Sequence, residues 1–271
     1  MTAQPGRLVL LGHPVGHSLS PVFQNAALHA ANIPLVYELL DVPTEALDRV
    51  LAGLVAESGA GNVTIPHKGR VAERCHRLLP LAVRTGAVNT FWTEHGRLIG
   101  DNTDVAGFTA AVRDLLGEVP HDIEVAMIGA GGGAAGVLAA IEGWGGCRVR
   151  LYNRTVAHAE SLAARFHAFA TVAESSSAAT ARAALVVNAT SVGLHDDSLP
   201  FDVEALAPSA AVLDLVYRPG ASALVRAARA LGHRAGGGLE MLVAQGALAF
   251  ERWFGVAPDR ALMWEAVRHL G

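Results

Sequence analysis

The segment with the clearest potential for chemistry is Asn62-Val63-Thr64-Ile65-Pro66-His67-Lys68. An ammonium group such as that of Lys68 can stabilise charge that develops on an oxygen atom and can supply a proton to it. The alternation of apolar and polar residues predicts a half-buried strand over 61–65, which Pro66 ends, with Lys68 in the loop that follows. An ordinary strand end with a solvated lysine explains the same residues.

A second residue that can do chemistry is Asp104, a carboxylate that follows Thr103 at the start of a helix predicted over 105–116. A carboxylate can keep a neighbouring cation charged and can accept hydrogen bonds from hydroxyl groups. Thr103 can also cap the helix, and the helix dipole favours a negative charge in the first turn. Stabilisation of the helix start is therefore a complete alternative explanation of Asp104.

Two serines lie in the loop after a strand predicted over 8–11. Ser18 and Ser20 are two residues apart, so in an extended segment both hydroxyls face one side, where they can hold a carboxylate. Ser20 is also a suitable N-cap for a helix that has Pro21 at its first position. Both roles are compatible, with Ser18 on a ligand and Ser20 partly in the cap.

A glycine-rich turn, Gly129-Ala130-Gly131-Gly132-Gly133, follows a strand predicted over 124–128 and precedes a helix and a further strand. In this βαβ order, glycines allow a pyrophosphate to approach, and free amides at the helix N-terminus bind it. The pattern is not the strict GxGxxG, and a bare structural turn is the alternative.

The residues after the next strand indicate which dinucleotide would bind. NAD-binding proteins usually carry Asp or Glu there, but this chain has Asn153-Arg154-Thr155 and no acid until Glu160. A guanidinium group and a hydroxyl bind a 2′-phosphate, which a carboxylate would repel. NADP is therefore the predicted cofactor; a solvated Arg154 and a helix-capping Thr155 are the alternative.

The length, net charge and residue composition of the chain argue against several classes of function. At 271 residues the chain is long enough for two domains, and its net charge of −4 without a basic tract argues against a nucleic-acid partner. The sequence contains no apolar run of membrane-spanning length and no signal-peptide pattern. The two cysteines are far apart and form no CxxC pair, which fits a cytoplasmic location, and no His/Cys spacing predicts a metal site.

Strands and helices alternate along the chain, which predicts an α/β fold with a mainly parallel sheet. The expected strands span 8–11, 36–40, 61–65, 86–92, 124–128, 148–152, 185–188 and 211–216. The expected helices span 22–31, 44–55, 70–79, 105–116, 137–144 and 239–253. Asn89 is an amide inside the strand 86–92, and Gln245 either faces solvent or turns its amide into a cleft.

The chain resembles the shikimate dehydrogenase family along nearly its whole length. The shared motifs, in the family's order, are HSLSP at 17–21, NVTIPHK at 62–68, GAVNT at 86–90, GDNTD at 100–104, GAGGGAAG at 129–136, NRT at 153–155, NATSVG at 188–193, YRP at 217–219 and GLEMLVAQGALAF at 238–250. Each motif is modest evidence alone, but the ordered set is highly specific.

The resemblance implies reversible NADPH-dependent reduction of 3-dehydroshikimate to shikimate, on the route to chorismate and the aromatic amino acids. It implies two α/β domains with a cleft between them: a substrate-binding domain (1–104 with 238–271) and an inserted Rossmann-type NADP-binding domain (105–237). Shikimate is then the small-molecule partner, with no nucleic acid or membrane partner, and the chain can form a homodimer.

The resemblance also implies a role for particular residues. The catalytic pair is Lys68 and Asp104. The substrate-binding residues are Ser18, Ser20, Thr64, Lys68, Asn89, Asp104, Tyr217 and Gln245. The NADP(H)-binding residues are Gly129, Ala130, Gly131, Gly132, Gly133, Asn153, Arg154, Thr155, Thr190, Val216, Gly238 and Met241.

Departures from the family pattern concern the phosphate sites. Many relatives carry Arg where this chain has Ala135, and some NADP-specific ones carry a second Arg where it has His158. The 2′-phosphate contact therefore depends more on Arg154. The alternatives within the family are an NAD-dependent quinate/shikimate dehydrogenase, an aminoshikimate enzyme and a non-catalytic binding relative. The last should have lost Lys68 or Asp104, and both are present.

Overall fold

The computed structural model describes residues 4–218 and 220–270, so Pro219 of the YRP motif lies outside the described residues. The chain forms two compact units. Unit 1 contains the chain up to Gly107 together with Leu242–Arg268, and unit 2 contains Phe108–Met241 with the end of the chain. Both units are α/β, as the alternation of strands and helices predicts.

Unit 1 is built on a mixed six-stranded sheet in the order β2-β1-β3-β5-β6-β4. Its strands are β1 (Arg7–Gly12), β2 (Tyr37–Asp41), β3 (Gly59–Val63), β4 (Arg77–Leu78), β5 (Thr90–Glu94) and β6 (Arg97–Asp101). The pairs β1–β2, β1–β3 and β4–β6 are parallel, whereas β5 is antiparallel to both β3 and β6. The loops after β1, β2 and β3 therefore leave the sheet at one edge, which is where the polar motifs of this unit begin.

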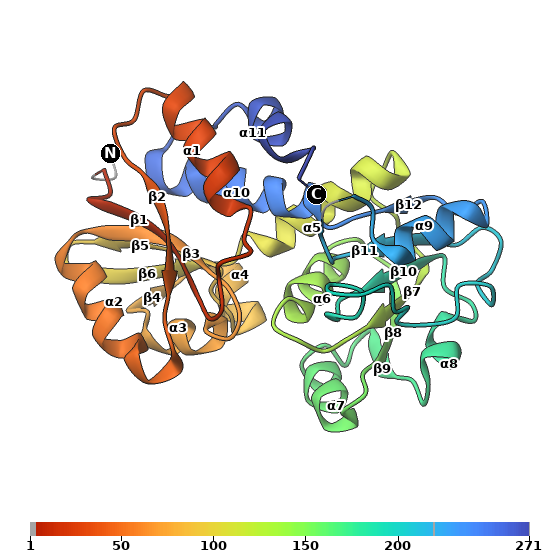
Figure 1. The fold of residues 1–271 in the computed structure, drawn as a ribbon. Coiled ribbons are helices and arrows are strands. Elements are labelled where there is room, and N and C mark those ends of the chain that lie inside the picture. The colour runs from red at the N-terminus through yellow and green to blue at the C-terminus, as the bar shows by residue number, and fades with distance from the viewer. Residues whose placement is uncertain (1–3, 219, 271) are drawn as a thin grey trace. The chain divides into compact units, whose positions relative to one another are not determined.

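Helices cover both faces of this sheet (Figure 1). They are α1 (Ser20–Ala30), α2 (Leu47–Ala56) after the short turn η1 (Thr44–Ala46), α3 (Lys68–Arg74), α4 (Pro80–Thr85), α10 (Leu239–Phe254) and α11 (Arg260–Val267). Val9, Leu11 and Val63 pack with the leucines of α2 in one core, because alternate strand residues face one side. Gly61 has no room for a side chain, since a Cβ there would lie 2.0 Å from the carbonyl oxygen of Val9.

Unit 2 holds a fully parallel six-stranded sheet in the order β12-β11-β10-β7-β8-β9. Its strands are β7 (Glu124–Ile128), β8 (Arg148–Tyr152), β9 (Ala170–Val172), β10 (Leu185–Asn188), β11 (Ala211–Asp214) and β12 (Ala235–Gly236). Its helices are α5 (Asp104–Leu116), which starts in unit 1, α6 (Ala134–Glu142), α7 (Val156–Arg165), α8 (Ser176–Thr180) and α9 (Ala223–Ala230). This arrangement is the doubly wound sheet that the βαβ pattern predicts.

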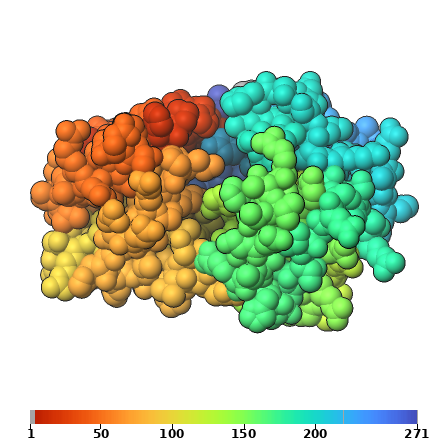
Figure 2. Space-filling model, turned by 90° about the horizontal axis from the view of Figure 1, so that it is seen from below, coloured from red at the N-terminus to blue at the C-terminus, as the bar shows by residue number. Residues whose placement is uncertain are grey.

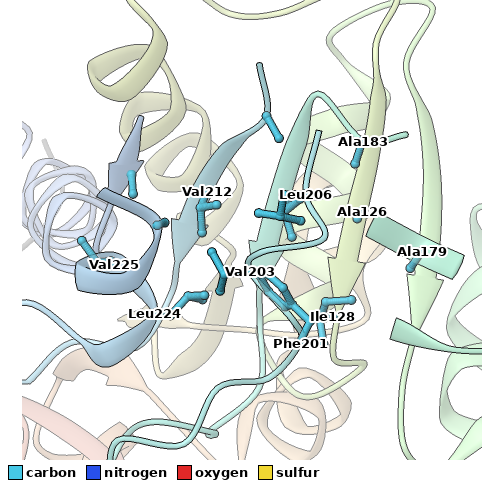
Figure 3. Close-up of a cluster of buried hydrophobic side chains, with 14 of the residues drawn as sticks. Ala126, Ile128, Ala179, Ala183, Phe201, Val203, Leu206, Val212, Leu224 and Val225 are labelled. Carbon is cyan, nitrogen blue, oxygen red and sulfur yellow. The ribbon is translucent and has the colours of Figure 1, made fainter. Parts of the chain in front are cut away.

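One core of unit 2 lies between its sheet and the elements that cover one face. Ala126, Ile128 and Val212 point from the strands toward Phe201, Val203 and Leu206 of the loop before β11 and toward Leu224 and Val225 of α9 (Figure 3). The strand residues on this face are separated by two positions, as the pleat of a strand requires. Burial of both sheet faces explains why these strands are nearly continuous apolar runs.

Several predicted elements are wrong in unit 1. The expected helix 70–79 is instead α3, which ends at Arg74, followed by strand β4 paired with β6. The expected half-buried strand 61–65 ends at Val63, and Ile65, which was expected to lie in it, is outside the strand and 63% exposed. The expected strand 86–92 begins only at Thr90.

Among the described residues, no helix combines the length and the apolar character needed to cross a membrane.

Candidate active site

The centre of the site in unit 1 is an ion pair between Lys68 and Asp104. Lys68 is the first residue of α3 rather than a loop residue, and Asp104 is the first residue of α5. Lys68 Nζ lies 2.6 Å from Asp104 Oδ2, and the two side chains are 15% and 8% exposed. A solvated lysine and a carboxylate that only stabilises a helix start do not explain this pair. Its partial burial protects the interaction from solvent screening.

Asn89 joins this pair to the rest of the site. Asn89 Oδ1 accepts a hydrogen bond from Thr103 N at 2.7 Å, which fixes the orientation of the amide because the backbone N–H can only donate. Asn89 Nδ2 then lies 2.8 Å from Asp104 Oδ1, 3.0 Å from Thr103 Oγ1 and 3.1 Å from Gln245 Oε1. Asn89 precedes β5 and is not inside a strand as predicted, and this position frees its side chain for these contacts.

Gln245 belongs to the same network. It is 7% exposed, and its Nε2 donates to the carbonyl oxygen of Leu242 at 2.8 Å. Its Oε1 is therefore turned toward Asn89. The alternative, a glutamine on the solvent side of α10, is wrong.

Two residues that sequence reasoning missed support Asp104. Asn102 accepts a hydrogen bond from Asp104 N at 3.0 Å and donates to Thr85 Oγ1 and to Ala87 O, both at 3.0 Å. Thr103, considered only as a cap, directs its hydroxyl to Asn89. The available signal was the run of four consecutive polar residues, 101–104, after an apolar strand, since such a run is buried only when each group has a partner.

The serine loop has a different local structure from the prediction. Helix α1 begins at Ser20 itself, and its cap residue is Leu19, which provides no side-chain cap. Ser18 Oγ accepts from Ser20 N at 3.2 Å, so Ser18 rather than Ser20 binds a free amide at the helix start. Pro21 follows at the start of the helix, as predicted.

Backbone hydrogen bonds join the serine loop to the lysine segment. Thr64 N donates to Leu11 O at 2.8 Å, and His13 N donates to Ile65 O at 3.0 Å. Gly12 leaves no space at this junction, since a Cβ there would lie 2.4 Å from Thr64 Cγ2. Thr64 itself is half-buried and lies beyond the end of β3.

The glycine turn of unit 2 lies between β7 and α6, as predicted. Gly129 has φ of 112°, and a Cβ there would lie 2.8 Å from the Ala189 carbonyl group, so the position requires glycine. Ala130 N donates to Asn153 Oδ1 at 3.1 Å, which ties the turn to the end of β8. Gly131 and Gly132 are exposed at the start of α6. The turn thus offers free backbone amides beside a helix N-terminus, where an anionic phosphate is stabilised.

Arg154 and Thr155 are exposed on the surface of unit 2, within the segment coloured green in Figure 2. Thr155 is the cap residue of α7, but its side chain makes no cap hydrogen bond, so the capping explanation of Thr155 is wrong. In the part of the chain that the structure describes, the Arg154 guanidinium has no hydrogen-bond or ion-pair partner. Asn153 Nδ2 donates to Thr155 O at 2.8 Å and shapes this turn.

A buried carboxylate organises the loops after β10 and β11. Asp214 Oδ1 lies 2.8 Å from Asn188 Nδ2, and Asp214 Oδ2 accepts from the hydroxyl of Ser222. Asn188 Oδ1 in turn accepts from both the backbone and the hydroxyl of Thr190, and Val216 N donates to Asp214. Two of the predicted cofactor residues, Thr190 and Val216, are therefore held by one network.

The remaining predicted residues of unit 2 lie near the same loops. Gly238 N donates to Val216 O at 3.3 Å, and a Cβ at Gly238 would lie 2.3 Å from Leu215 O. Strand β11 ends at Asp214, two residues earlier than predicted, which leaves Val216 in the loop. Tyr217 and Met241 are half-buried.

The Asp214 network predicts a pH dependence of stability. Burial raises the pKa of the Asp214 carboxyl above its ordinary value of 3.8, and hydrogen bonds from Ser222, Val216 and Asn188 offset this only in part. The folded state therefore binds the proton more tightly, so this contribution to stability is present below pH 3.8 and is lost as pH rises through the raised pKa. We expect the free energy of unfolding of the wild type, minus that of Asp214→Asn, to fall as pH rises from 3.8.

Urea unfolding at stepped pH measures this difference. Asp196→Asn is a matched control, because a hydrogen bond from Ser198 N lowers the pKa of that exposed carboxyl and the slope should have the opposite sign. A pH-independent difference for Asp214→Asn would contradict the assignment.

Two family models and many curated proteins match this chain, and they agree on one family. The model of the shikimate dehydrogenase substrate binding domain matches residues 10–91, and that of the shikimate 5′-dehydrogenase C-terminal domain matches residues 238–268. The NADP⁺ shikimate dehydrogenase of Rubrobacter xylanophilus is 43% identical over 267 residues, covering 95% of this chain and 94% of that protein.

Solved structures agree with the sequence comparisons. The shikimate 5-dehydrogenase of Thermus thermophilus, solved with NADP(H) and shikimate, is 39% identical, with a TM-score of 0.88 over 97% of this chain and 98% of that one. The quinate dehydrogenase of Corynebacterium glutamicum, solved with NAD, has a TM-score of 0.89 but is only 28% identical, covering 97% of this chain and 98% of that one. The fold is thus shared by enzymes named for different substrates. The matches along nearly the whole length show that the chain belongs to the shikimate dehydrogenase family.

Proposed function

We propose that the protein is an NADP-dependent shikimate dehydrogenase, which reversibly reduces 3-dehydroshikimate to shikimate on the route to chorismate and the aromatic amino acids. The observation that carries the proposal is the partly buried Lys68–Asp104 pair, which Asn89 and Gln245 enclose. The NADP⁺ shikimate dehydrogenases among its relatives support this substrate and this cofactor.

The residues of unit 2 fit NADP(H). The amides of the Gly129–Gly133 turn suit the pyrophosphate, and the unpartnered Arg154 with Thr155 suits the 2′-phosphate. Thr190, Val216, Gly238 and Met241 complete the proposed cofactor residues. The chemistry that NADPH would supply when held by these residues is a hydride for the substrate carbonyl carbon.

The proposed role of Lys68 is to act on the carbonyl oxygen. As the oxygen gains negative charge, an ammonium group beside it stabilises that charge and can deliver a proton. Asp104 holds the ammonium group in place through one carboxylate oxygen, while Asn89 fixes the other oxygen. This arrangement pre-organises the charge before the substrate arrives, which is the condition for effective electrostatic catalysis.

The remaining polar groups of unit 1 suit a small hydroxylated acid. Ser18 and Ser20 are proposed to bind its carboxylate, and Thr64, Asn89, Asp104 and Gln245 its hydroxyls. Tyr217 is also proposed to be a substrate-binding residue. We also propose that 1–104 with 238–271 forms the substrate-binding domain and 105–237 the NADP-binding domain. The homodimer and the cytoplasmic location stay predictions, the latter in keeping with two free thiols, Cys75 and Cys147.

Initial rates measured with shikimate or quinate, each with NADP or NAD, test the proposal. We expect the highest kcat/KM with shikimate and NADP. Activity with quinate and NAD alone would replace the proposal with the NAD-dependent alternative. Absence of activity with all four combinations would favour a binding relative instead.

A further inference from the structure

We propose that His67 is a positioning residue for Lys68. Its ring forms a hydrogen bond between the turn that precedes Lys68 and the loop after β2, and this bond fixes the position of the Lys68 ammonium group. This inference rests on the proposed function, because it assigns Lys68 a task in catalysis.

The ring of His67 is fully buried, with 0% of the residue exposed. A side chain in this position cannot touch a substrate, so any effect on catalysis must pass through its neighbours. Its Nε2 lies 2.6 Å from the carbonyl oxygen of Val42. Because a carbonyl oxygen can only accept, Nε2 carries a hydrogen and donates it to Val42 O. Nδ1 has no partner among the described residues, so Val42 is the single polar contact of the ring.

Val42 is a junction between three loops at one edge of the sheet. Val42 N donates to Gly12 O at 2.9 Å, at the start of the serine loop, and Val42 O accepts a hydrogen bond from His67 Nε2. The ends of the parallel strands β1, β2 and β3 lie side by side, so one residue after β2 can reach both neighbours. The hydrogen bond from the His67 ring connects Val42 to the turn after β3, which leads into Lys68.

The backbone of His67 transmits this link directly to Lys68. His67 is the cap residue of α3, and its carbonyl oxygen accepts from Val71 N at 2.9 Å in the first turn. His67 N donates to Thr64 O at 3.0 Å and closes the turn after β3. Loss of the ring contact would leave a buried carbonyl at Val42 without its donor and would release the start of the helix that carries Lys68.

The expected kinetic effect is specific. Thr64, a proposed substrate-binding residue, is still held by the hydrogen bond from its N–H to Leu11 O, which does not depend on His67. A displaced ammonium group, in contrast, lowers the rate of the chemical step, since a shift of about 1 Å can cost about 10²-fold. We expect His67→Phe, which keeps an aromatic ring without the donor, to lower kcat about tenfold or more, with KM for shikimate changed less than about threefold.

Rescue by a conservative variant distinguishes positioning from general loss of packing. The amide of Gln reaches the place of Nε2, whereas the shorter amide of Asn reaches only that of Nδ1. His67→Gln should therefore keep kcat within about threefold of the wild type, and His67→Asn should resemble His67→Phe, because only Gln restores the hydrogen bond. If His67→Phe fails to fold, the Gln and Asn pair decides the question.

Thr93→Val is the matched control. It removes a hydrogen bond of 2.9 Å from Thr93 Oγ1 to Gly59 O, at the start of β3 and thus at its opposite end from Lys68. Its kcat should be unchanged. Equal kcat in the Gln and Asn variants, or a well-folded His67→Phe with kcat within about twofold of the wild type, would overturn the inference. Lack of shikimate oxidation by the wild type would instead refute the proposed function, and the same variants would then be compared on the substrate that it does oxidise.

Discussion

Lys68→Ala is expected to lower kcat for shikimate oxidation by about 10³-fold, while KM for shikimate changes less than about threefold. Loss of one pre-organised group facing a developing oxyanion costs about 10²–10³-fold, and loss of the group that exchanges a proton with that oxygen adds to this. The effect falls on kcat because the charge on the oxygen is larger in the transition state than in the bound substrate. Steady-state kinetics with saturating NADP measure both constants.

Arg74→Ala provides the control for this variant. Arg74 is a cation at the other end of the same helix, α3, and its guanidinium is half-exposed and pairs with Asp48 at 2.8 Å. Its removal should leave kcat unchanged. Because Lys68→Ala also leaves the buried carboxylate of Asp104 without its cation, urea unfolding should accompany the kinetics. A folded Lys68→Ala variant with nearly normal kcat would exclude Lys68 from the chemistry.

Arg154→Ala is expected to lower kcat/KM for NADP by about 10- to 100-fold, because hydrogen bonds to a charged group contribute about 1.5–3 kcal/mol. Activity with NAD should change little, since NAD carries no 2′-phosphate for the guanidinium to bind. The unpartnered state of Arg154 in the described chain means that its loss breaks no internal contact. Initial rates over a range of each cofactor give the ratio of the two kcat/KM values.

Arg182→Ala serves as the charge-matched control, since Arg182 is an exposed arginine of unit 2 outside the proposed cofactor residues. His158→Arg tests the converse, because a cation in the first turn of α7, added to Arg154 just before the helix, should raise the preference for NADP. If Arg154→Ala reduced activity with both cofactors equally, the arginine would serve the fold or a shared part of the cofactor rather than the 2′-phosphate.

The sequence alone determined the α/β class, the glycine turn and most strands of unit 2. The strands β7, β8 and β10 have the predicted bounds. Their success has a local cause: a parallel strand covered on both faces is a continuous apolar run, and glycine or polar residues mark its end. The family resemblance of the sequence also identified Lys68 and Asp104 as a pair and selected Asn89 and Gln245, but it did not provide the contacts of these two amides.

Only the tertiary structure decided how those side chains are held. Strand β4 replaces part of a predicted helix because two residues pair with β6, a contact between segments that local propensity does not encode. The orientation of Gln245 toward Asn89 follows from the packing of α10 against a loop that lies 156 residues earlier in the chain. The supporting roles of His67, Asn102 and Thr103 escaped notice for the same reason. A buried polar group is identified by its partner, and the partners of these side chains become neighbours only when the sheet forms.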